Sequence, residues 1–573
     1  MQGTRVTFDV REIPFSRRGA WIGLSPVVGI HDTSDTIHLV SHQTGMHAVL
    51  ALVPERAAAP VATIWSADAA VLAWRAQDGG SVEAVFDGPT TIRLRGRGLA
   101  LRLRDATPGL TPFTGTFLFT DPVDGAAVFT SYETGRRYRV TGLSGSLQTV
   151  GDGALGVADR AVVLGAAGGD WEAALEEIDT ARSPYRSKAR FGDLVAAVEE
   201  EFDSFVDAVA PWRSDAVPAA ALAAYVLWSA TVAPAGFLTR ESVLMSKHWM
   251  DKVWSWDHCF NAMALAAGLP DLALDQLLVP FDHQDASGAL PDSVAHSEVL
   301  RNFVKPPIHG WAFRRLRRTA GRPLTRAELG EVHDRLAAWT RFWLDHRRRP
   351  GHELPYYQHG NDSGWDNATT FDRTRVVESP DLAAFLVLQL DVVADLADEL
   401  DLPSTRWRDA GERLREALLD RLWTGSELVA VGALDDVPIS GTSLLHLLPL
   451  VLGDRLPLEV RTALADRVHA HLTEHGPATE PVGSDRYEDD GYWRGPIWAP
   501  STALLEDGLR SSGFTDLADT LSERFRRLCE TSGFAENFDA RTGQGLRDRA
   551  YAWTAAVYLV LAADHVARPR QDG

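Results

Sequence analysis

The segment Leu194-Val-Ala-Ala-Val-Glu-Glu-Glu-Phe-Asp-Ser-Phe-Val206 marks a change of pattern that runs through the whole chain. Its apolar residues recur at the period of an α-helix and form one stripe, which Glu199, Glu200 and Glu201 flank. The patterns that follow stay helical, whereas no long helical periodicity precedes Trp171. The sequence therefore predicts a mainly α protein with an all-β N-terminal domain.

Short apolar or alternating runs fill the chain up to about residue 190, and Gly, Asp and Pro separate them. Examples are Thr36-Ile-His-Leu-Val40, Thr91-Ile-Arg-Leu-Arg95 and Tyr138-Arg-Val-Thr-Gly-Leu143. This pattern of short apolar runs separated by turn-forming residues is typical of strands joined by turns. We expect residues 1–190 to form an antiparallel β-sandwich.

About twelve helices are predicted after residue 190, several with start signals such as Thr325 and Ser379-Pro380. Beyond the segment quoted first, they are expected at 216–232, 258–268, 271–282, 309–320, 326–347, 380–400, 404–422, 456–473, 498–510, 514–530 and 549–566. We expect residues 191–215 to be a helical linker. Residues 216–573 would then close most economically into an (α/α)6 barrel.

Composition excludes several classes of protein. The chain has 573 residues, 45% of them hydrophobic and 24% charged, as in ordinary globular proteins. A net charge of −21 disfavours a nucleic-acid partner. Cys259 and Cys529 are too few for a disulfide framework, and neither a secretory h-region nor a membrane-length apolar run is visible. We expect a cytoplasmic monomer or small homo-oligomer without a membrane partner.

Two distant segments each place a carboxylate among glycines, amides and aromatics. They are His359-Gly-Asn-Asp-Ser-Gly-Trp-Asp-Asn-Ala368, around Asp366, and Gly533-Phe-Ala-Glu-Asn-Phe-Asp-Ala-Arg-Thr-Gly543, around Glu536. Glycoside hydrolysis needs one protonated carboxyl and one carboxylate. We therefore predict that Asp366 is a general acid, because Trp365 lowers local polarity, and that Glu536 is its partner. Asp539 is the competing base, and a turn or a solvated loop is the plain alternative for each carboxylate.

Aromatic and bidentate polar residues around these segments suit a sugar ring. The predicted substrate contacts are Trp256, Asp257, Gln284, Asp292, Trp311, Gly364, Trp365, Trp493, Arg494 and Trp498. The plain alternatives are that Asp257 caps a helix and that a third to half of the tryptophans fill the core. Three of the four lysines, including Lys305, lie near these segments, where an ammonium group suits a substrate hydroxyl or carboxylate.

No metal or organic cofactor is expected. The run Asp485-Arg-Tyr-Glu-Asp-Asp-Gly491 resembles part of a calcium loop but lacks the alternating ligands and the distal Glu of an EF-hand. No zinc spacing, catalytic triad or glycine-rich phosphate loop is visible. The expected partner is a small-molecule sugar substrate.

Three of these motifs together resemble the inverting clan that contains trehalases and glycoside hydrolase family 63. They are Val253-Trp-Ser-Trp-Asp-His258, Ser363-Gly-Trp-Asp366 and Tyr492-Trp-Arg-Gly-Pro-Ile-Trp498, and the stretch Glu536–Gly543 is similar to family 63 itself. The resemblance covers roughly residues 215–570. It implies an (α/α)6 catalytic domain, Asp366 as general acid and Glu536 as general base. It also implies inversion by an activated water, with the two carboxyls about 6.5–9.5 Å apart.

The substrate is left open between two classes. Met245-Ser-Lys-His-Trp-Met-Asp-Lys252 stands in place of a trehalase-type arginine-rich approach, which disfavours trehalose. A large N-terminal β-domain looks more like the bacterial α-glucosidase branch than the glycerate-glycoside hydrolases. The first hypothesis is thus an exo-acting hydrolase that releases glucose from a small α-glucoside or oligosaccharide. The alternatives are hydrolysis of α-glucosyl- or α-mannosyl-glycerate, a non-catalytic carbohydrate-binding barrel and, with low weight, lyase or debranching chemistry.

Overall fold

The computed structural model describes residues 6–107 and 109–568. Contacts divide the chain into two units. The first runs to Asp207 and adds Ala224–Lys252 and Ala295–Ser297, whereas the second holds Ala208–Ala223, Val253–Val294 and the chain from Glu298 onward. The division falls inside helix α1 (Phe191–Val209) rather than at residue 190.

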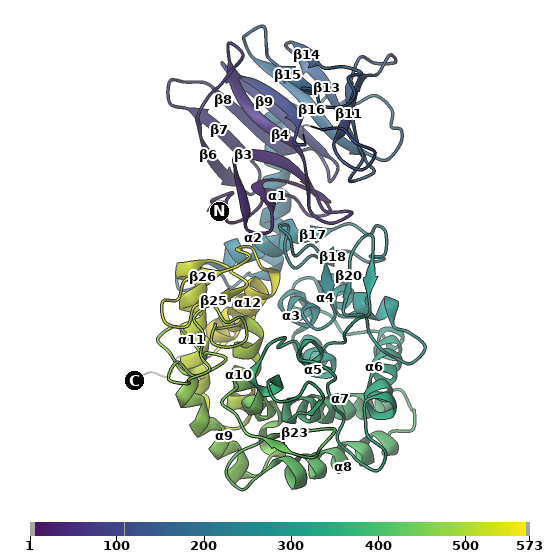
Figure 1. Ribbon diagram of the computed structural model, residues 1–573, viewed down its shortest axis with the longest axis vertical. Helices are drawn as coiled ribbons and strands as arrows, with labels where there is room; N and C mark the ends of the chain where they lie inside the picture. Colours follow the sequence, from purple (N-terminus) through teal and green to yellow (C-terminus); the bar gives the residue numbers. More distant parts are fainter. Residues whose placement is uncertain (1–5, 108, 569–573) are drawn as a thin grey trace. The chain divides into compact units, whose positions relative to one another are not determined.

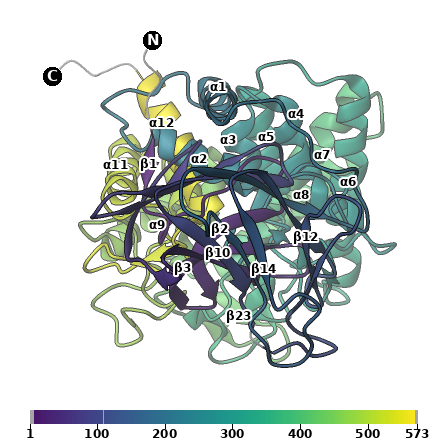
Figure 2. The same ribbon diagram turned by 90° about the horizontal axis from the view of Figure 1, so that it is seen from above.

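The first unit contains two large antiparallel sheets (Figure 1). One has nine strands in the order β1 (Thr7–Phe8), β6 (Thr63–Asp68), β7 (Leu72–Ala76), β8 (Ser81–Phe86), β9 (Thr91–Arg97), β16 (Trp171–Ile178), β13 (Arg137–Ser144), β12 (Ala127–Ser131) and β11 (Thr116–Thr120). The other runs β14 (Leu147–Val150), β15 (Ala161–Leu164), β10 (Ala100–Asp105), β4 (His47–Arg56), β3 (Asp32–Ser41) and β2 (Ile22–Gly29), with β5 (Ala59–Pro60) on β4. Figure 2 shows β2, β3, β10 and β14 in one layer.

Both sheets contribute to one hydrophobic core. Leu50 and Leu52 of β4 share a buried cluster with Ile92 and Leu94 of β9. Residues two apart point to the same face of a strand, so each sheet turns one apolar face inward. The predicted all-β N-terminal part is confirmed. A two-stranded sheet of β17 (Thr231–Val232) and β18 (Ser242–Val243) also belongs to this unit.

Helices dominate the second unit. They are α3 (His258–Leu265), α4 (Pro270–Leu278), α5 (His309–Thr319), α6 (Arg326–His346), α7 (Pro380–Glu399), α8 (Thr405–Leu422), α9 (Leu458–His471), α10 (Ala499–Ser511), α11 (Thr515–Ser532) and α12 (Ala552–Ala567), with the 3₁₀ segments η1 (Val279–His283), η2 (Gly360–Ser363), η3 (Thr369–Phe371) and η4 (Leu444–Arg455). Helix α2 (Ala220–Ala230) lies across the boundary between the two units. The predicted helical ranges are confirmed to within a few residues at their ends.

Six of these elements contact one another in a closed ring. The contacts run from α3 to α5, α7, η4, α10, α12 and back to α3. Figure 1 shows α6, α8, α9 and α11 outside this ring. Segment η4 was not predicted, because Pro449 and the non-helical Gly453 (φ +58°) interrupt its helical pattern. The ring gathers the chain segments that precede α3, α5, α10 and α12.

Short sheets connect the helices. They are β19 (Val253–Trp254), β20 (Ser293–Val294) and β21 (Val299–Leu300); β22 (Val377–Glu378), β23 (Ala430–Gly432) and β24 (Pro438–Ile439); and β25 (Asn537–Phe538) with β26 (Gly545–Leu546). No helix among residues 6–107 and 109–568 combines the length and the apolarity needed to cross a membrane.

Candidate active site

Asp366 lies just after the short helix η2. Gly364 ends this helix at φ +75°, a conformation that glycine adopts without strain. A Cβ at Gly364 would lie 2.5 Å from Cζ2 of Trp256, so the turn also packs directly on that indole. Asp366 keeps 30% of its side chain accessible, and burial raises the pKa of its carboxyl. Both features suit a proton donor.

Asn367 fastens the Asp366 loop to the segment that carries Trp493. Its amide nitrogen donates to the carbonyl of Gly491 (2.9 Å), and its amide oxygen accepts from the backbone N–H of Trp493 (3.0 Å). Arg494 donates to the carbonyl of Asn367 (2.8 Å) and pairs with Asp372. Arg494 was predicted to contact the substrate, but its hydrogen bonds go to acceptors within the protein. They connect the segment that carries Trp493 to the loop that carries Asp366. Sequence reasoning did not single out Asn367.

Asp257 and Asp292 come together through a small sheet. Strand β19 leads into Trp256-Asp257 and pairs with β20, and the N–H of Ser255 donates to the carbonyl of Asp292 (3.3 Å). Asp257 precedes α3 but makes no side-chain capping bond, and its Oδ2 has no partner among the described residues. Burial raises the pKa of Asp257 to about 8, against the opposing charge of Lys305. A buried carboxyl without a structural partner is a candidate ligand for hydroxyls.

Lys305 is the cation of this group of carboxylates. Its ammonium lies 3.1 Å from Asp292, 3.9 Å from Asp366 and donates to the carbonyl of Asn361 (2.9 Å). Burial alone lowers the pKa of Lys305, but Asp366, Asp292 and Asp257 outweigh burial and raise it above its usual value. Lys305 therefore stays charged and links Asp292 to the loop that carries Asp366.

Glu536 lies between α11 and strand β25. Its side chain is 3% exposed, and its backbone N–H donates to the carbonyl of Asp548 (2.7 Å). Burial raises the pKa of Glu536 to about 8, the charge of Asp548 raises it further, and Arg547 opposes both. Asp539, the competing base, accepts hydrogen bonds from the backbone N–H groups of Arg541 and Thr542 (2.8 Å each) and so stabilises a turn.

Tyr492 shows that the separate carboxylates converge. Burial raises the pKa of its phenol, and the charges of Glu536, Asp366 and Asp257 raise it further, in that order. Tyr492 adopts φ +63°, which is rare for a residue with a side chain. Arg547 lies 4.8 Å over its ring. Three carboxyls from three distant loops therefore lie near enough to one phenol to act on it, and this tyrosine is held in a strained backbone conformation.

The tryptophans around this group pack against one another. Trp493 stacks on Trp498 (ring centroids 3.9 Å apart) and on Trp365 (4.7 Å), while Trp553 meets Trp256 and Trp498 edge-on. Each of these rings is at most 3% exposed. The N–H groups of Trp493 and Trp553 are buried without an acceptor among the described residues. The cluster therefore combines packed apolar rings with two indole N–H groups that have no acceptor among the described residues.

The remaining predicted contacts have partners inside the protein. Gln284 donates to the carbonyls of Gly288 (2.9 Å) and Arg335 (3.1 Å). The indole of Trp311 donates to Asp507 (2.7 Å), and that of Trp498 donates to the carbonyl of Tyr492 (2.8 Å). Within the described part of the chain, no group of three His, Cys, Asp or Glu side chains forms a metal site.

Carboxyls of raised pKa beside stacked indoles suit an enzyme that cleaves glycosides, and comparisons with known proteins agree with this class. The model of the mannosylglycerate hydrolase MGH1-like glycoside hydrolase domain matches residues 250–554. The chain belongs to this family, within glycoside hydrolase family 63, and is a glycoside hydrolase. The match begins after the two large sheets.

Relatives of known function match between half and three fifths of this chain. A mannosylglycerate hydrolase from Rubrobacter radiotolerans is 26% identical over 396 residues, which cover 53% of this chain and 89% of the relative. A glucosylglycerate hydrolase from Mycolicibacterium hassiacum is 24% identical over 446 residues, covering 59% and 96%. The crystal structure of a family 63 mannosylglycerate hydrolase from Thermus thermophilus in complex with Tris has a TM-score of 0.52 at 22% identity, covers 60% of this chain and 99% of its own, and shows a shared fold.

Proposed function

We propose that this enzyme hydrolyses a small α-glycoside of glycerate, glucosyl- or mannosyl-, with inversion at the anomeric carbon. The sequence alone ranked a neutral α-glucoside first. The functions of the relatives support the glycerate alternative instead. The observation that carries the proposal is the convergence of Asp366, Asp257 and Glu536 around Tyr492. For the fold of the second unit we propose an (α/α)6 barrel, which the closed ring of helix contacts supports.

In the proposed mechanism Asp366 protonates the glycosidic oxygen while Glu536 removes a proton from the attacking water. The raised pKa of Asp366 keeps a proton available to the leaving group. The pKa of Glu536, about 8, makes its carboxylate a strong base once it is ionised. Asp257 and Asp292 would hold sugar hydroxyls. The free indole N–H groups of Trp493 and Trp553 would add donors.

Two cations border the carboxylates and would attract the carboxylate of glycerate. Lys305 is 5% exposed and already shared among three carboxyls. Arg547 pairs with a single, exposed carboxylate, that of Asp490 (2.6 Å), keeps 22% of its side chain accessible and lies beside Glu536. A guanidinium also matches a carboxylate with two parallel hydrogen bonds. Arg547 is therefore the better proposed contact for an acidic aglycone.

A substrate panel tests the proposal. Glucosylglycerate, mannosylglycerate, maltose and trehalose are offered to the wild type and to Asp366→Asn, and the first-formed anomer is followed by NMR. We expect glycerate glycosides to be cleaved with β-sugar appearing first and Asp366→Asn to be inactive while folded. If only maltose is cleaved, the substrate is a neutral α-glucoside and the glycerate proposal is wrong. Initial α-sugar contradicts inversion, and binding without cleavage by the wild type favours the non-catalytic alternative.

A further inference from the structure

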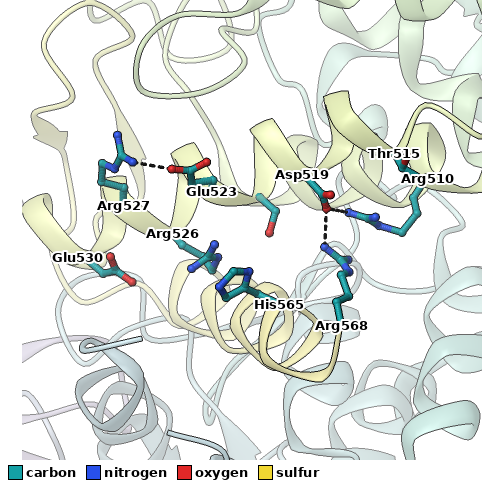
Figure 3. Close-up of a pocket in the computed structure, with 10 residues that line it drawn as sticks. Arg510, Thr515, Asp519, Glu523, Arg526, Arg527, Glu530, His565 and Arg568 are labelled. Atoms are coloured by element: carbon teal, nitrogen blue, oxygen red, sulfur yellow. Dashed lines mark hydrogen bonds and ion pairs between the residues drawn. The ribbon is translucent and has the colours of Figure 1, made fainter. Parts of the chain in front are cut away.

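A cavity of about 690 Å3 lies among α10, α11 and α12 (Figure 3). Arg510, Arg526, Arg527 and Arg568 line it together with three carboxylates. This concentration of guanidinium groups contrasts with a chain whose net charge is −21. Its volume falls in the usual range for small-molecule sites.

Three of these arginines already have acidic partners. Arg510 and Arg568 both donate to Asp519, at 2.6 and 3.0 Å, and both also pair with Glu506. Arg527 pairs with Glu523 one helical turn away (2.6 Å). Figure 3 shows these pairs at opposite ends of the cavity, with Arg526 between them. Their charges are satisfied locally.

Arg526 differs from the other three. It is 7% exposed, its Nε is buried without a partner, and none of the described residues accepts a hydrogen bond from it. The carboxylate of Glu530 attracts it through space but accepts its hydrogen bond from Tyr558 instead (2.9 Å). A buried N–H without an acceptor costs free energy, so an acceptor that enters the cavity and reaches the Arg526 guanidinium would bind it with a gain.

His565 lies next to Arg526 in the cavity (Figure 3). Burial lowers the pKa of His565, and the charges of Arg526 and Arg568 lower it further. Its imidazole is thus mainly neutral near pH 7 and provides one N–H donor without a further charge. Arg526 supplies the charge and His565 a second direction for hydrogen bonding.

We propose that this cavity is an oxyanion-binding site for a small molecule that carries a phosphate or carboxylate group, held by Arg526 with His565 beside it. None of the residues that line it is a proposed catalytic or sugar-binding residue. Guanidinium groups favour both oxyanions because their N–H fork matches two oxygens at once.

Calorimetric titration with inorganic phosphate and, in a second arm, malonate tests the proposal at constant ionic strength and without any glycoside. We expect one saturable site with a dissociation constant of about 1 mM or below for at least one anion. The tighter of the two identifies the phosphate or the carboxylate class. Because no substrate is present, failure here is distinguishable from failure of the proposed hydrolysis.

Arg526→Gln and Arg527→Gln form a matched pair, since they remove equal charge from neighbouring positions on α11. Loss of a charge-assisted hydrogen bond should weaken binding about tenfold or more in Arg526→Gln and only about twofold in Arg527→Gln. If Arg526→Gln and Arg527→Gln weaken anion binding equally, the effect is general electrostatics and the proposed site is wrong. The proposal is also wrong if neither anion saturates the wild-type protein. If Arg526→Gln does not fold, Arg526→Lys must still weaken binding, because lysine lacks the fork.

Discussion

Replacement of Glu536 by Gln should raise stability and abolish activity at the same time. Folding raises the pKa of this carboxyl from its ordinary 4.5 to about 8, mainly by burial. The difference of about 3.5 corresponds to roughly 5 kcal/mol at ~1.4 kcal/mol per pKa unit, and we take it as an upper figure. Gln keeps the shape and the neutrality of the protonated acid. We expect a gain of about 1–5 kcal/mol at high pH.

The gain must depend on pH with a definite sign. Below about pH 4.5 Glu536 is protonated in both the folded and the unfolded chain, so Gln confers no advantage. Between pH 4.5 and about 8 the unfolded chain ionises first and holds fewer protons than the folded one, so the free energy of unfolding of the wild type falls as pH rises. The stabilisation by Glu536→Gln therefore grows across this window and levels off above it.

Urea unfolding at pH 4.5, 6 and 8 measures this effect. Tryptophan fluorescence is the signal, because the indole cluster next to Glu536 reports on the second unit. Asp539→Asn is the matched control, since Asp539 accepts turn hydrogen bonds three residues away. We expect kcat/KM to fall more than about 10³-fold in Glu536→Gln and less than tenfold in Asp539→Asn. A stability gain that does not grow with pH, or retained turnover, would refute the reasoning.

Two further predictions concern the loop that carries Gly364 and Asp366, the proposed general acid. Lys305→Met removes a charge that lowers the pKa of Asp366, so the limb of the kcat/KM profile that Asp366 sets should move to higher pH. Arg301→Gln, which affects an exposed pair, should leave both limbs in place, and two unmoved limbs in Lys305→Met contradict the assignment. Gly364→Ala should lower the free energy of unfolding by about 2–4 kcal/mol, from a strained backbone and a 2.5 Å contact with Trp256. Gly425→Ala, at φ +95° in open space, should lower the free energy of unfolding by only about 1–2 kcal/mol. An equal loss in both variants would show that the Trp256 indole moves aside and that the close contact adds no cost.

The sequence predicted helices well where they have one polar face. Helix α6 begins at its capping box on Thr325 and Glu328, as a local motif dictates. Segment η4 escaped prediction because Pro449 and Gly453 interrupt the helical pattern of Leu444–Arg455, although it completes the ring. Which helices touch depends on the packing of many distant residues, and periodicity carries no information about that.

The candidate site was predictable in its residue types and less so in their partners. The sequence left open whether Asp257 caps α3, and its side chain makes no capping bond. Gln284 and Arg494 have the polar groups of a sugar contact, but neighbouring carbonyls take their donors. Hydrogen-bond partners of this kind come from loops far away in the sequence. Asn367 illustrates the converse, because nothing local reveals that it joins two loops.

Trp493 shows how packing changes the chemistry that a residue type suggests. The sequence favoured it as a stacking plane for a sugar. Trp365 and Trp498 both stack on its ring, at 4.7 and 3.9 Å, so the two faces of the indole are occupied by other indoles. Its N–H, buried and without an acceptor among the described residues, is the polar group that remains. An apolar sugar face therefore finds no free face of Trp493 to stack on, and packing has removed the contact that the residue type suggested.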